Sequence, residues 1–420
     1  MVLRKDVVIT GIGVVSPIGT GVDRFWSSLI EGRSGIRNLT HVTADMLPYT
    51  YGGQLTDFDP KAYVRPRKTL KVMSRELQTA FSACVMATQQ SGFDVAGTPK
   101  ERIATVFGSE MLYGEPEEIQ PTVARSSPEG RFQPELWGPS AMKEIFPLWM
   151  LKYLPNMAAC HYGIAIGALG PNNTIVMGDT SGLSAVAESI SVIQRGAADV
   201  VVTCSTGTRI SLTRLLYQGS VPYGSLRDPV GSSCRPFSSD RDGLIGGEGA
   251  AAVILESREH AERRGAKPLV SIGGYSCNYG APAAGRRGSP EALSLAIGSA
   301  IERAGATPEE IGIAVSHAMG DPMLDQIDAQ VHQSIVPQAI VTAPKGAMGH
   351  LGAGCGVMEM SIAALALQHG IVPPTVNAES KDPQYGIDLA AAPRPTNASL
   401  AVQSNHSATG NAIAVVLRKE

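Results

Sequence analysis

The chain has 420 residues, of which 43 % are hydrophobic and 17 % charged, and its formal net charge is −3. This balance excludes an intrinsically disordered protein, and the small net charge argues against a protein that binds nucleic acid. The length allows two or three domains of ordinary size.

Neither apolar runs nor cysteines indicate a membrane or secreted protein. No uninterrupted apolar run approaches the roughly 20 residues that span a bilayer. The six cysteines are scattered and form no Cys-x-x-Cys pair, which fits a reducing compartment and gives no support to a zinc site. We therefore expect a cytoplasmic protein without a membrane span, a metal or a cofactor.

The first predicted elements are a strand, a helix and a second strand. Residues 7–15 predict a buried strand that enters a glycine turn, and this turn lacks the third glycine of a dinucleotide-binding loop. Residues 68–92 have helical periodicity, and residues 103–107 predict another short buried strand. Residues 113–146 are rich in Pro, Gly, Glu and Ser, which favours a long surface excursion that acts as a lid or an interface loop.

A βαβ unit follows in the middle of the chain. Residues 174–177 predict a strand, residues 180–195 an amphipathic helix, and residues 200–204 the next strand. Gly178 and Asp179 form the turn between the first strand and the helix. Asp179 therefore lies at the N-terminus of the helix.

The second half repeats this design. Residues 313–316 and 340–343 predict strands, and a helix follows from about residue 352 to residue 369. An α/β chain with two similar halves indicates an internal duplication rather than separable domains. We divide the chain into an N-terminal half, residues 1–252, and a C-terminal half, residues 253–420.

A series of motifs runs over nearly the whole chain: VITGIGVVSPIG at 8–19, Phe25 to Ile36, Asn156 to Ala159, GPNNT at 170–174, RPFSSDRDG at 235–243 with GEGA at 247–250, His317 with Pro322 and Asp325, and Lys345 with Gly349-His350-Leu-Gly-Ala353. In content and in order these stretches resemble the β-ketoacyl synthase family of the thiolase superfamily, in its elongating branch. The resemblance implies a five-layer α-β-α-β-α thiolase-like fold with two duplicated halves. It also implies a two-fold dimer, which we expect to form through the strand at about 199–204.

The family's chemistry assigns roles to the matching positions. A cysteine at a helix N-terminus, where the dipole favours the thiolate, takes an acyl group from an acyl carrier protein. Two histidines then stabilise the enolate formed when a malonyl thioester loses carbon dioxide. His317 and His350 fall at these histidine positions. Lys345 is the expected supporting residue, and Asp328 is its expected partner.

The chain departs from the family at the nucleophile. Where the family reads Ala-Cys-x-Ser-Gly, this chain has Gly178-Asp-Thr-Ser-Gly182, so Asp179 takes the position of the cysteine. A carboxylate is a poor acyl acceptor, because the resulting mixed anhydride is destroyed by water. Thr180 and Ser181 are expected to cap the helix rather than act as nucleophiles. Cys160 is expected to be structural.

A second departure lies near the C-terminus. The family has a loop there, rich in glycine and phenylalanine, that gates the site. This chain reads Ser404-Asn-His-Ser-Ala-Thr-Gly-Asn411 and lacks the gating phenylalanine. His406 and Thr409 are therefore possible additional pocket residues.

The resemblance implies a protein of fatty-acid or polyketide biosynthesis that acts on acyl chains bound to an acyl carrier protein. Without a cysteine, the chemistry would be decarboxylation of a malonyl thioester or acid/base catalysis by Asp179, His317 and His350. An ionised Asp179 would repel the malonyl carboxylate. The alternative is a non-catalytic subunit, like a chain-length factor, that pairs with an active ketosynthase. The expected partners are thus the carrier protein, an acyl or malonyl thioester, and a second subunit in a homodimer or heterodimer.

Overall fold

A long mixed sheet forms the centre of the computed structural model, which describes residues 5–217 and 219–420. Its strand order is β13-β11-β10-β15-β16-β9-β1-β8-β7-β5-β6, with β2 paired to β1. The strands are β1 Val7–Ser16, β2 Gly19–Thr20, β5 Ile103–Ser109, β6 Asn172–Val176, β7 Val200–Thr208, β8 Glu248–Ser257, β9 Val270–Tyr279, β10 Ile311–Val315, β11 Ile340–Thr342, β13 Asp388–Leu389, β15 Leu400–His406 and β16 Asn411–Lys419. Two small pairs lie apart from it: β3 Ile36–Asn38 with β4 Tyr51–Gly53, and β12 Ile371–Val372 with β14 Arg394–Pro395.

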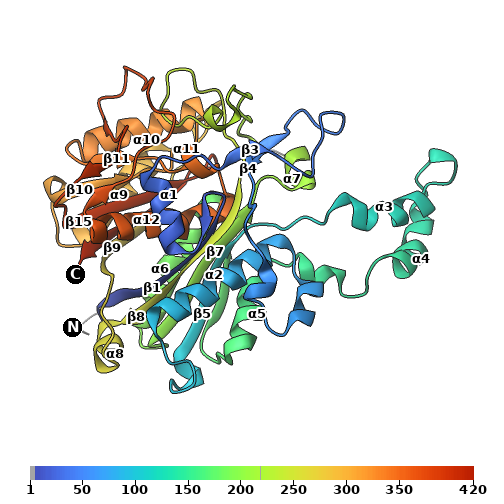
Figure 1. Cartoon of the computed structure of the whole chain (residues 1–420), viewed down its shortest axis with the longest axis horizontal. Coiled ribbons are helices and arrows are strands. Elements are labelled where there is room, and N and C mark those ends of the chain that lie inside the picture. Colours follow the sequence, from blue (N-terminus) through green and yellow to red (C-terminus); the bar gives the residue numbers. More distant parts are fainter. Residues whose placement is uncertain (1–4, 218) are drawn as a thin grey trace.

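The helices lie in layers on the faces of this sheet (Figure 1). α2 and α5 pack on the outer face of the N-terminal strands, and α9, backed by α10, packs on the C-terminal strands. α6 and α12 lie between the two halves, in contact with strands of both. The helices are α1 Val22–Ile30, α2 Arg75–Ser91, α3 Pro116–Arg125, α4 Pro134–Glu144, α5 Met157–Ile166, α6 Ser181–Gln194, α7 Leu212–Leu216, α8 Arg258–Arg263, α9 Pro290–Arg303, α10 Pro322–Ile335, α11 Lys345–Met348 and α12 Cys355–His369. This is the predicted five-layer α-β-α-β-α arrangement.

The central layer follows from composition. α12 is apolar on all sides, and its residues from Cys355 to Leu367 are buried. A helix that is hydrophobic nearly all round is stable only where every face is covered, so α12 belongs between the two halves of the large sheet. Among the residues that the structure describes, no helix combines the length and apolarity needed to cross a bilayer.

The two halves join through short pairings at the middle of the sheet. β1 pairs with β9 only at Val8↔Ser271 and Ile9↔Val270, whereas it pairs with β8 along most of its length. β8 belongs to the first half throughout. The predicted division between residues 252 and 253 falls inside this strand.

The strand that we expected at the dimer edge lies inside the sheet. β7 pairs in parallel with β5 on one side and antiparallel with β8 on the other, and all nine of its residues are buried. A continuous apolar run is typical of a central strand, not of an edge. The expectation of a dimer through residues 199–204 is therefore wrong. The edge strand of this half is β6, which is partly exposed.

The segment 113–146 contains two helices and forms an arm. α3 and α4 pack against each other and project from the body (Figure 1). Each helix has a proline in its first turn, where the missing N–H costs nothing. Their weak periodicity reflects a mostly exposed hairpin, because neither helix buries a full apolar face.

Candidate active site

A sharp turn between β6 and α6 holds Asp179. Gly178 has φ 59°, a conformation that favours glycine, and Asp179 follows it with 9 % of its surface exposed. The hydroxyl of Thr180 donates to the carbonyl of Met177 at 3.0 Å, and Ser181 Oγ donates to the carbonyl of Gly178 at 2.7 Å. These hydroxyls brace the turn and bind no N–H of the helix's first turn. The prediction that they cap the helix is wrong.

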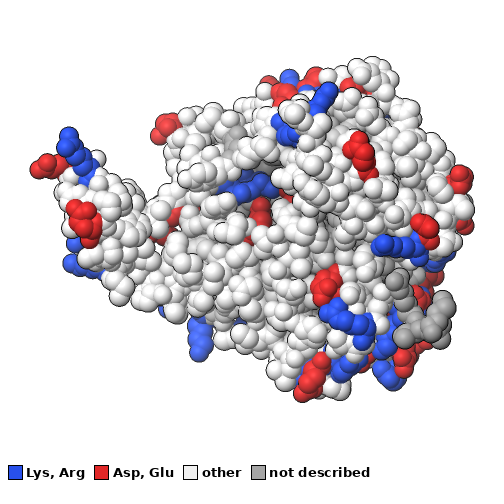
Figure 2. Space-filling view, turned by 180° about the vertical axis from the view of Figure 1, so that it is seen from behind, with Lys and Arg blue, Asp and Glu red and all other residues white. Residues whose placement is uncertain are grey.

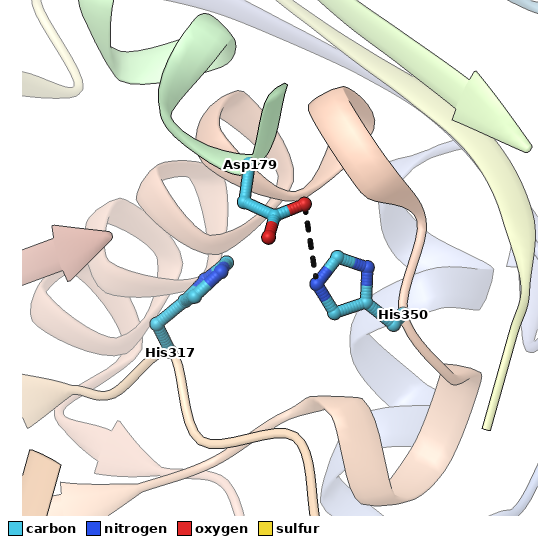
Figure 3. Close-up of side chains that lie close together, drawn as sticks. All are labelled: Asp179, His317 and His350. Carbon is cyan, nitrogen blue, oxygen red and sulfur yellow. Dashed lines mark ion pairs between the residues drawn. The ribbon is translucent and has the colours of Figure 1, made fainter. Parts of the chain in front are cut away.

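Asp179, His317 and His350 converge, although they come from separate elements (Figure 3). One nitrogen or oxygen atom from each of the three lies within 4.8 Å of the others. His350 Nε2 is 3.6 Å from Asp179 Oδ1, and the rings of His317 and His350 have centroids 5.6 Å apart. His317 follows β10 and His350 follows α11, and both rings are buried.

The hydrogen bonds of the two imidazoles indicate where their protons lie. His350 Nδ1 accepts the N–H of Gly352 at 2.9 Å, so in the neutral ring the proton is on Nε2. His317 Nδ1 lies 2.8 Å from Lys345 Nζ and 2.5 Å from Asn405 Nδ2, which are donors, and 3.1 Å from the acceptor Glu359 Oε2; because the two donors lie closer, we assign the proton of this ring to Nε2 as well. Neither Nε2 atom has a hydrogen-bond partner among the described residues. The site thus presents two free N–H donors beside one carboxylate.

This tautomer also bears on metal binding. Two histidines and a carboxylate are a familiar ligand set for a divalent transition metal. A histidine that ligates through Nε2 must carry its proton on Nδ1 and donate it to an acceptor. Here Gly352 presents a donor to Nδ1 of His350, so the surroundings oppose ligation by that ring, whereas Nδ1 of His317 has both the donor Lys345 and the acceptor Glu359 beside it.

Lys345 pairs with Glu359, not with Asp328. Its ammonium group contacts Glu359 Oε1 and donates to the carbonyl of His317 at 2.8 Å, and Asn405 Nδ2 donates to Glu359 Oε2 at 2.6 Å. Glu359 extends from the central helix α12 directly behind His317. Asp328 lies on the outer helix α10 and is engaged there, so the expected pair Lys345–Asp328 is wrong.

The two possible pocket residues have different positions. His406 is buried, its Nε2 is 3.0 Å from Asp328 Oδ2, and its ring centroid is 5.9 Å from that of His317. It therefore lies behind the site. Thr409 is exposed in the turn between β15 and β16 and lines the cavity in front of Asp179. The predicted gating loop is only a hairpin turn in this chain.

Sequence reasoning missed three charged residues beside Asp179. Arg209 Nη2 is 2.8 Å from Asp179 Oδ1 and 3.6 Å from Glu110 Oε2, and Arg214 Nη2 is 3.2 Å from the same oxygen of Glu110. Glu110 directly follows β5 and Arg209 directly follows β7. Polar residues at the carboxyl ends of neighbouring parallel strands meet at one edge, so the two positions could be related once the pairing of β5 with β7 was known.

The charges fix the protonation of the site. Burial by itself raises the pKa of Asp179, but His350 and the permanently charged Arg209 outweigh it and hold the pKa well below its usual range. Burial, helped by Arg209 and Lys345, lowers the pKa of His350 well below its usual value, against the pull of Asp179. Burial and Lys345 likewise lower the pKa of His317. At neutral pH the site holds an ionised carboxylate and two neutral imidazoles.

A cavity of about 470 Å³ opens over these groups. Asp179, Arg209 and His350 lie at its inner side, and the remaining lining residues are Val176, Met177, Gly178, Gly219, Ser220, Val221, Leu244, Ser407, Ala408, Thr409 and Asn411. One face of the molecule is visibly hollowed, with basic and acidic side chains inside the hollow (Figure 2). A small polar substrate group can reach the carboxylate of Asp179 and the ring of His350 from this side, whereas His317 is buried behind them.

Comparison with known sequences assigns the family. Residues 4–261 match the family described as "Beta-ketoacyl synthase, N-terminal domain", and residues 269–379 match "Beta-ketoacyl synthase, C-terminal domain". The chain belongs to the β-ketoacyl synthase family. It is 30 % identical over 398 residues to the 3-oxoacyl-[acyl-carrier-protein] synthase 2 of Synechocystis sp. The matched region covers 92 % of this chain and 91 % of that protein. The protein of the same name from Staphylococcus aureus (strain N315) is 29 % identical over 395 residues, with the same coverage.

Solved structures agree with the thiolase-like fold predicted for this ketosynthase-family chain. The ishigamide ketosynthase/chain length factor has a TM-score of 0.84 at 23 % identity and covers the whole of both chains. A β-ketoacyl synthase from Burkholderia phymatum STM815 has a TM-score of 0.86 at 23 % identity and covers 99 % of this chain and 100 % of its own. The family and the fold class predicted from sequence are confirmed.

Proposed function

We propose that this protein binds an acyl thioester of an acyl carrier protein without forming a covalent acyl-enzyme, and removes a proton from the carbon next to the thioester carbonyl. The observation that carries the proposal is the position of His317 Nε2 and His350 Nε2 beside the carboxylate of Asp179, with no hydrogen-bond partner for either nitrogen among the described residues. Two fixed N–H donors stabilise the negative oxygen of an enolate. A carboxylate beside them serves as the base.

The reaction balances with these three groups. Asp179 Oδ1 is engaged by Arg209, and none of the hydrogen bonds or ion pairs of the described residues engages Oδ2. Oδ2 takes the α-proton, the C–H electron pair forms the enolate double bond, and the carbonyl oxygen receives the two Nε2–H bonds. The proton on Oδ2 returns to the same carbon or to a conjugated one. In a dehydration it passes instead to the β-hydroxyl group, which leaves as water with the electron pair of its C–O bond while the enolate becomes the unsaturated thioester. Isomerisation and dehydration belong to this class of reaction.

The charge of Asp179 favours this chemistry over decarboxylation. Asp179 occupies the sharp turn between β6 and α6. On our alignment the family has its cysteine at this position, so this chain has no thiol there for acyl transfer. A malonyl group would bring a second carboxylate beside an ionised one, which costs free energy in a buried site. A neutral acyl thioester brings no such charge. Because a low pKa makes Asp179 a weak base, the reaction depends on the enolate stabilisation by both histidines.

Exchange of the α-proton tests the proposal directly. Hexanoyl-pantetheine is incubated with the protein in D₂O, and its mass and that of the intact protein are measured. We expect deuterium at the α-carbon, at a rate well above that of buffer alone, and an unchanged protein mass. Exchange no faster than in buffer, or an acyl adduct on the protein, would contradict the proposal.

Matched variants locate the base. Asp179→Asn keeps the shape of the side chain but removes the charge, and we expect it to abolish exchange. His369→Ala is the control, because His369 is an exposed histidine at the end of α12 that stacks on Trp26. If Asp179→Asn exchanges the α-proton as fast as the wild type, the aspartate is not the base.

A non-catalytic subunit is the second candidate function, favoured by the similarity to a complex named as a ketosynthase with a chain length factor. In that case the ion pair between Asp179 and Arg209 would only stabilise the turn between β6 and α6. The two candidates differ in one measurement. A non-catalytic subunit shows no exchange alone, and its histidine variants leave a partner ketosynthase fully active.

We also infer a two-fold dimer through β6. This edge strand, the neighbouring α5 and the segment between them expose large apolar side chains: Val176 (45 %) on β6, Ile164 (79 %) on α5 and Leu169 (69 %) between the two. An exposed strand edge pairs readily with another strand, and a two-fold axis lets β6 pair with its own copy. The arm, which exposes further apolar side chains, would contact the second copy or a ketosynthase in its place.

A further inference from the structure

A second cavity, of about 480 Å³, lies at the base of the arm and shares no lining residue with the cavity over Asp179. Its lining includes Tyr113, Glu115 and Glu117, where the arm begins, and the start of α2 from Ser74 to Glu76. A molecule bound in this cavity would therefore contact both the arm and the body of the protein. The proposed chemistry makes no use of it.

Carboxylates outnumber cations in the lining of this cavity. Four glutamates line it, against a single arginine, Arg75, and no lysine. Arg75 Nε lies 3.1 Å from Glu248 Oε2, so these two charges compensate each other. Glu76, Glu115 and Glu117 take part in no ion pair within the described part of the chain. The cavity thus has three carboxylates that no arginine or lysine of its lining balances.

Glu76 is the most buried of these three. Its exposed fraction is 9 %, and no hydrogen bond between described residues engages its carboxylate. Neither oxygen is sealed inside the protein, so the carboxylate opens into the cavity that it lines. Burial raises the pKa of Glu76 to about 7. A buried polar group normally finds a partner, in the protein, in water or in a ligand, and for a carboxylate a cation fills this role.

The arrangement suits an organic cation better than a metal ion. Mg²⁺ and Ca²⁺ are held by several oxygen atoms packed around one ion. Among the described residues, only the site around Asp179 brings three ligand atoms within 4.8 Å of one another, and the glutamates of this cavity do not. Tyr113, Ile210 and Leu212 also line the cavity and supply apolar surface. Separate carboxylates with apolar surface among them fit a ligand that has both ammonium and methylene groups.

We propose that this cavity binds a protonated aliphatic diamine, with one ammonium group at Glu76 and the other at Glu115 and Glu117. An ammonium group has three N–H donors and no acceptor, which suits carboxylates that lack partners. Hydrogen bonds between oppositely charged groups are also the stronger ones. The methylene groups lie against the apolar lining. This inference is independent of the proposed function, because it concerns a different cavity.

Calorimetry on the full chain tests the inference. The probes are 1,4-diaminobutane and 1,6-diaminohexane, and the uncharged controls are 1,4-butanediol and 1,6-hexanediol, which have the same chain lengths. We expect at least one diamine to bind with a dissociation constant of about 1 mM or tighter, a modest affinity for so small a ligand. The diols should give no measurable binding, since they bring no charge to the glutamates.

Variants from both sides of the proposed contact locate the bound diamine. Glu76→Gln keeps the shape of the side chain, and we expect it to weaken diamine binding about tenfold or more, because a charge-assisted hydrogen bond is lost. Glu115→Gln with Glu117→Gln, on the arm, should weaken binding similarly. Glu259→Gln is the matched control, because this glutamate on α8 is 74 % exposed and loses the same charge. Thermal unfolding reports whether each variant is folded.

Several results would overturn the inference. If neither diamine binds, or if the diols bind as tightly, the cavity does not recognise ammonium groups. If the variants at Glu76 and on the arm all bind like the wild type, the diamine is held elsewhere on the chain. If Asp179→Asn alone abolishes binding, the diamine lies in the cavity over Asp179. If Mg²⁺ at equal concentration displaces the diamine, whereas Na⁺ of the same ionic strength does not, the cavity is a metal site.

Discussion

The turn that holds Asp179 and the projecting arm differ in which side chains they bury and which they expose. Around Asp179 charged groups are buried and satisfied largely by one another, as in the Lys345–Glu359 and Asp179–Arg209 pairs. In the arm, apolar side chains are exposed, with Met142 at 89 % and Phe132 at 54 %. Burying a charge and exposing a large apolar side chain both cost free energy in an isolated chain. Each therefore points to a function, whereas an exposed charge or a buried leucine is ordinary and does not.

The contrast separates two roles. The buried charges lie on or next to α12, β10 and the turn that holds Asp179, and on our proposal they support chemistry. The exposed apolar groups lie on α3, α4, α5 and β6, and on our proposal they support association. Variants that disturb one region and leave the other intact will show how independent the two roles are.

The largest effect should come from the histidines. We expect His317→Ala or His350→Ala to reduce the rate of α-proton exchange by roughly 10²–10⁴-fold, because each removes a donor to the enolate oxygen. Exchange into hexanoyl-pantetheine in D₂O is the measurement, and sedimentation should show an unchanged oligomeric state. Loss of exchange together with loss of the oligomer would instead tie the site to the interface.

The buried ion pair behind the site should have the next largest effect. Lys345→Met leaves the carboxylate of Glu359 buried without its cation, and we expect a loss of about 3–5 kcal/mol in the free energy of unfolding. Lys345→Met with Glu359→Gln should recover part of that loss, because the orphaned charge is gone. Urea unfolding followed by circular dichroism measures both. A single variant as stable as the wild type would show that Asn405 and His317 alone hold Glu359.

This pair also marks the limit of sequence reasoning about the site. Asp179, His317, His350 and Lys345 were found because each stands in a recognisable motif. Glu359 was missed, although a lone acid in the apolar helix 355–369 signals a buried partner for a cation. Arg209 has no motif around it, and only the pairing of β5 with β7 places it beside Glu110 and Asp179.

The fold shows the same division between local and long-range information. Strands β1, β5 and β7 and helix α6 were predicted within a few residues, because their apolar patterns are local. The order of strands was not predicted. The apolar run of β7 was interpreted as an edge, whereas burial on both faces is what such a run indicates, and the polar Asn172–Val176 is the edge.

The third prediction concerns dimerisation through the exposed apolar surface of β6 and α5. Ile164→Lys places a charge on the exposed apolar surface beside β6, and we expect dimerisation to weaken on the order of 100-fold, as for a central interface residue. Leu295→Lys is the matched control, because Leu295 is 58 % exposed on α9 in the other half. Sedimentation velocity over a concentration series measures both. Equal behaviour of the two variants, or a monomeric wild type at micromolar concentration, would remove β6 and α5 as the interface.

The smallest effect should be that of pH between 7 and 8. The pKa values of Asp179 and His350 are held well below their usual values and that of His317 is lowered, so we expect all three groups to keep their protonation in this range. We expect the exchange rate, corrected for the buffer reaction, to vary by less than about threefold. At lower pH it should fall, because Asp179 loses its role as a base once it is protonated. Stability should fall in the same direction, since the unfolded chain binds protons on these groups at a higher pH than the folded chain does. A titration centred between pH 6 and 8 that disappears in His350→Gln would show that His350 carries a charge there, and the assignment of two neutral donors beside one carboxylate would have to be given up.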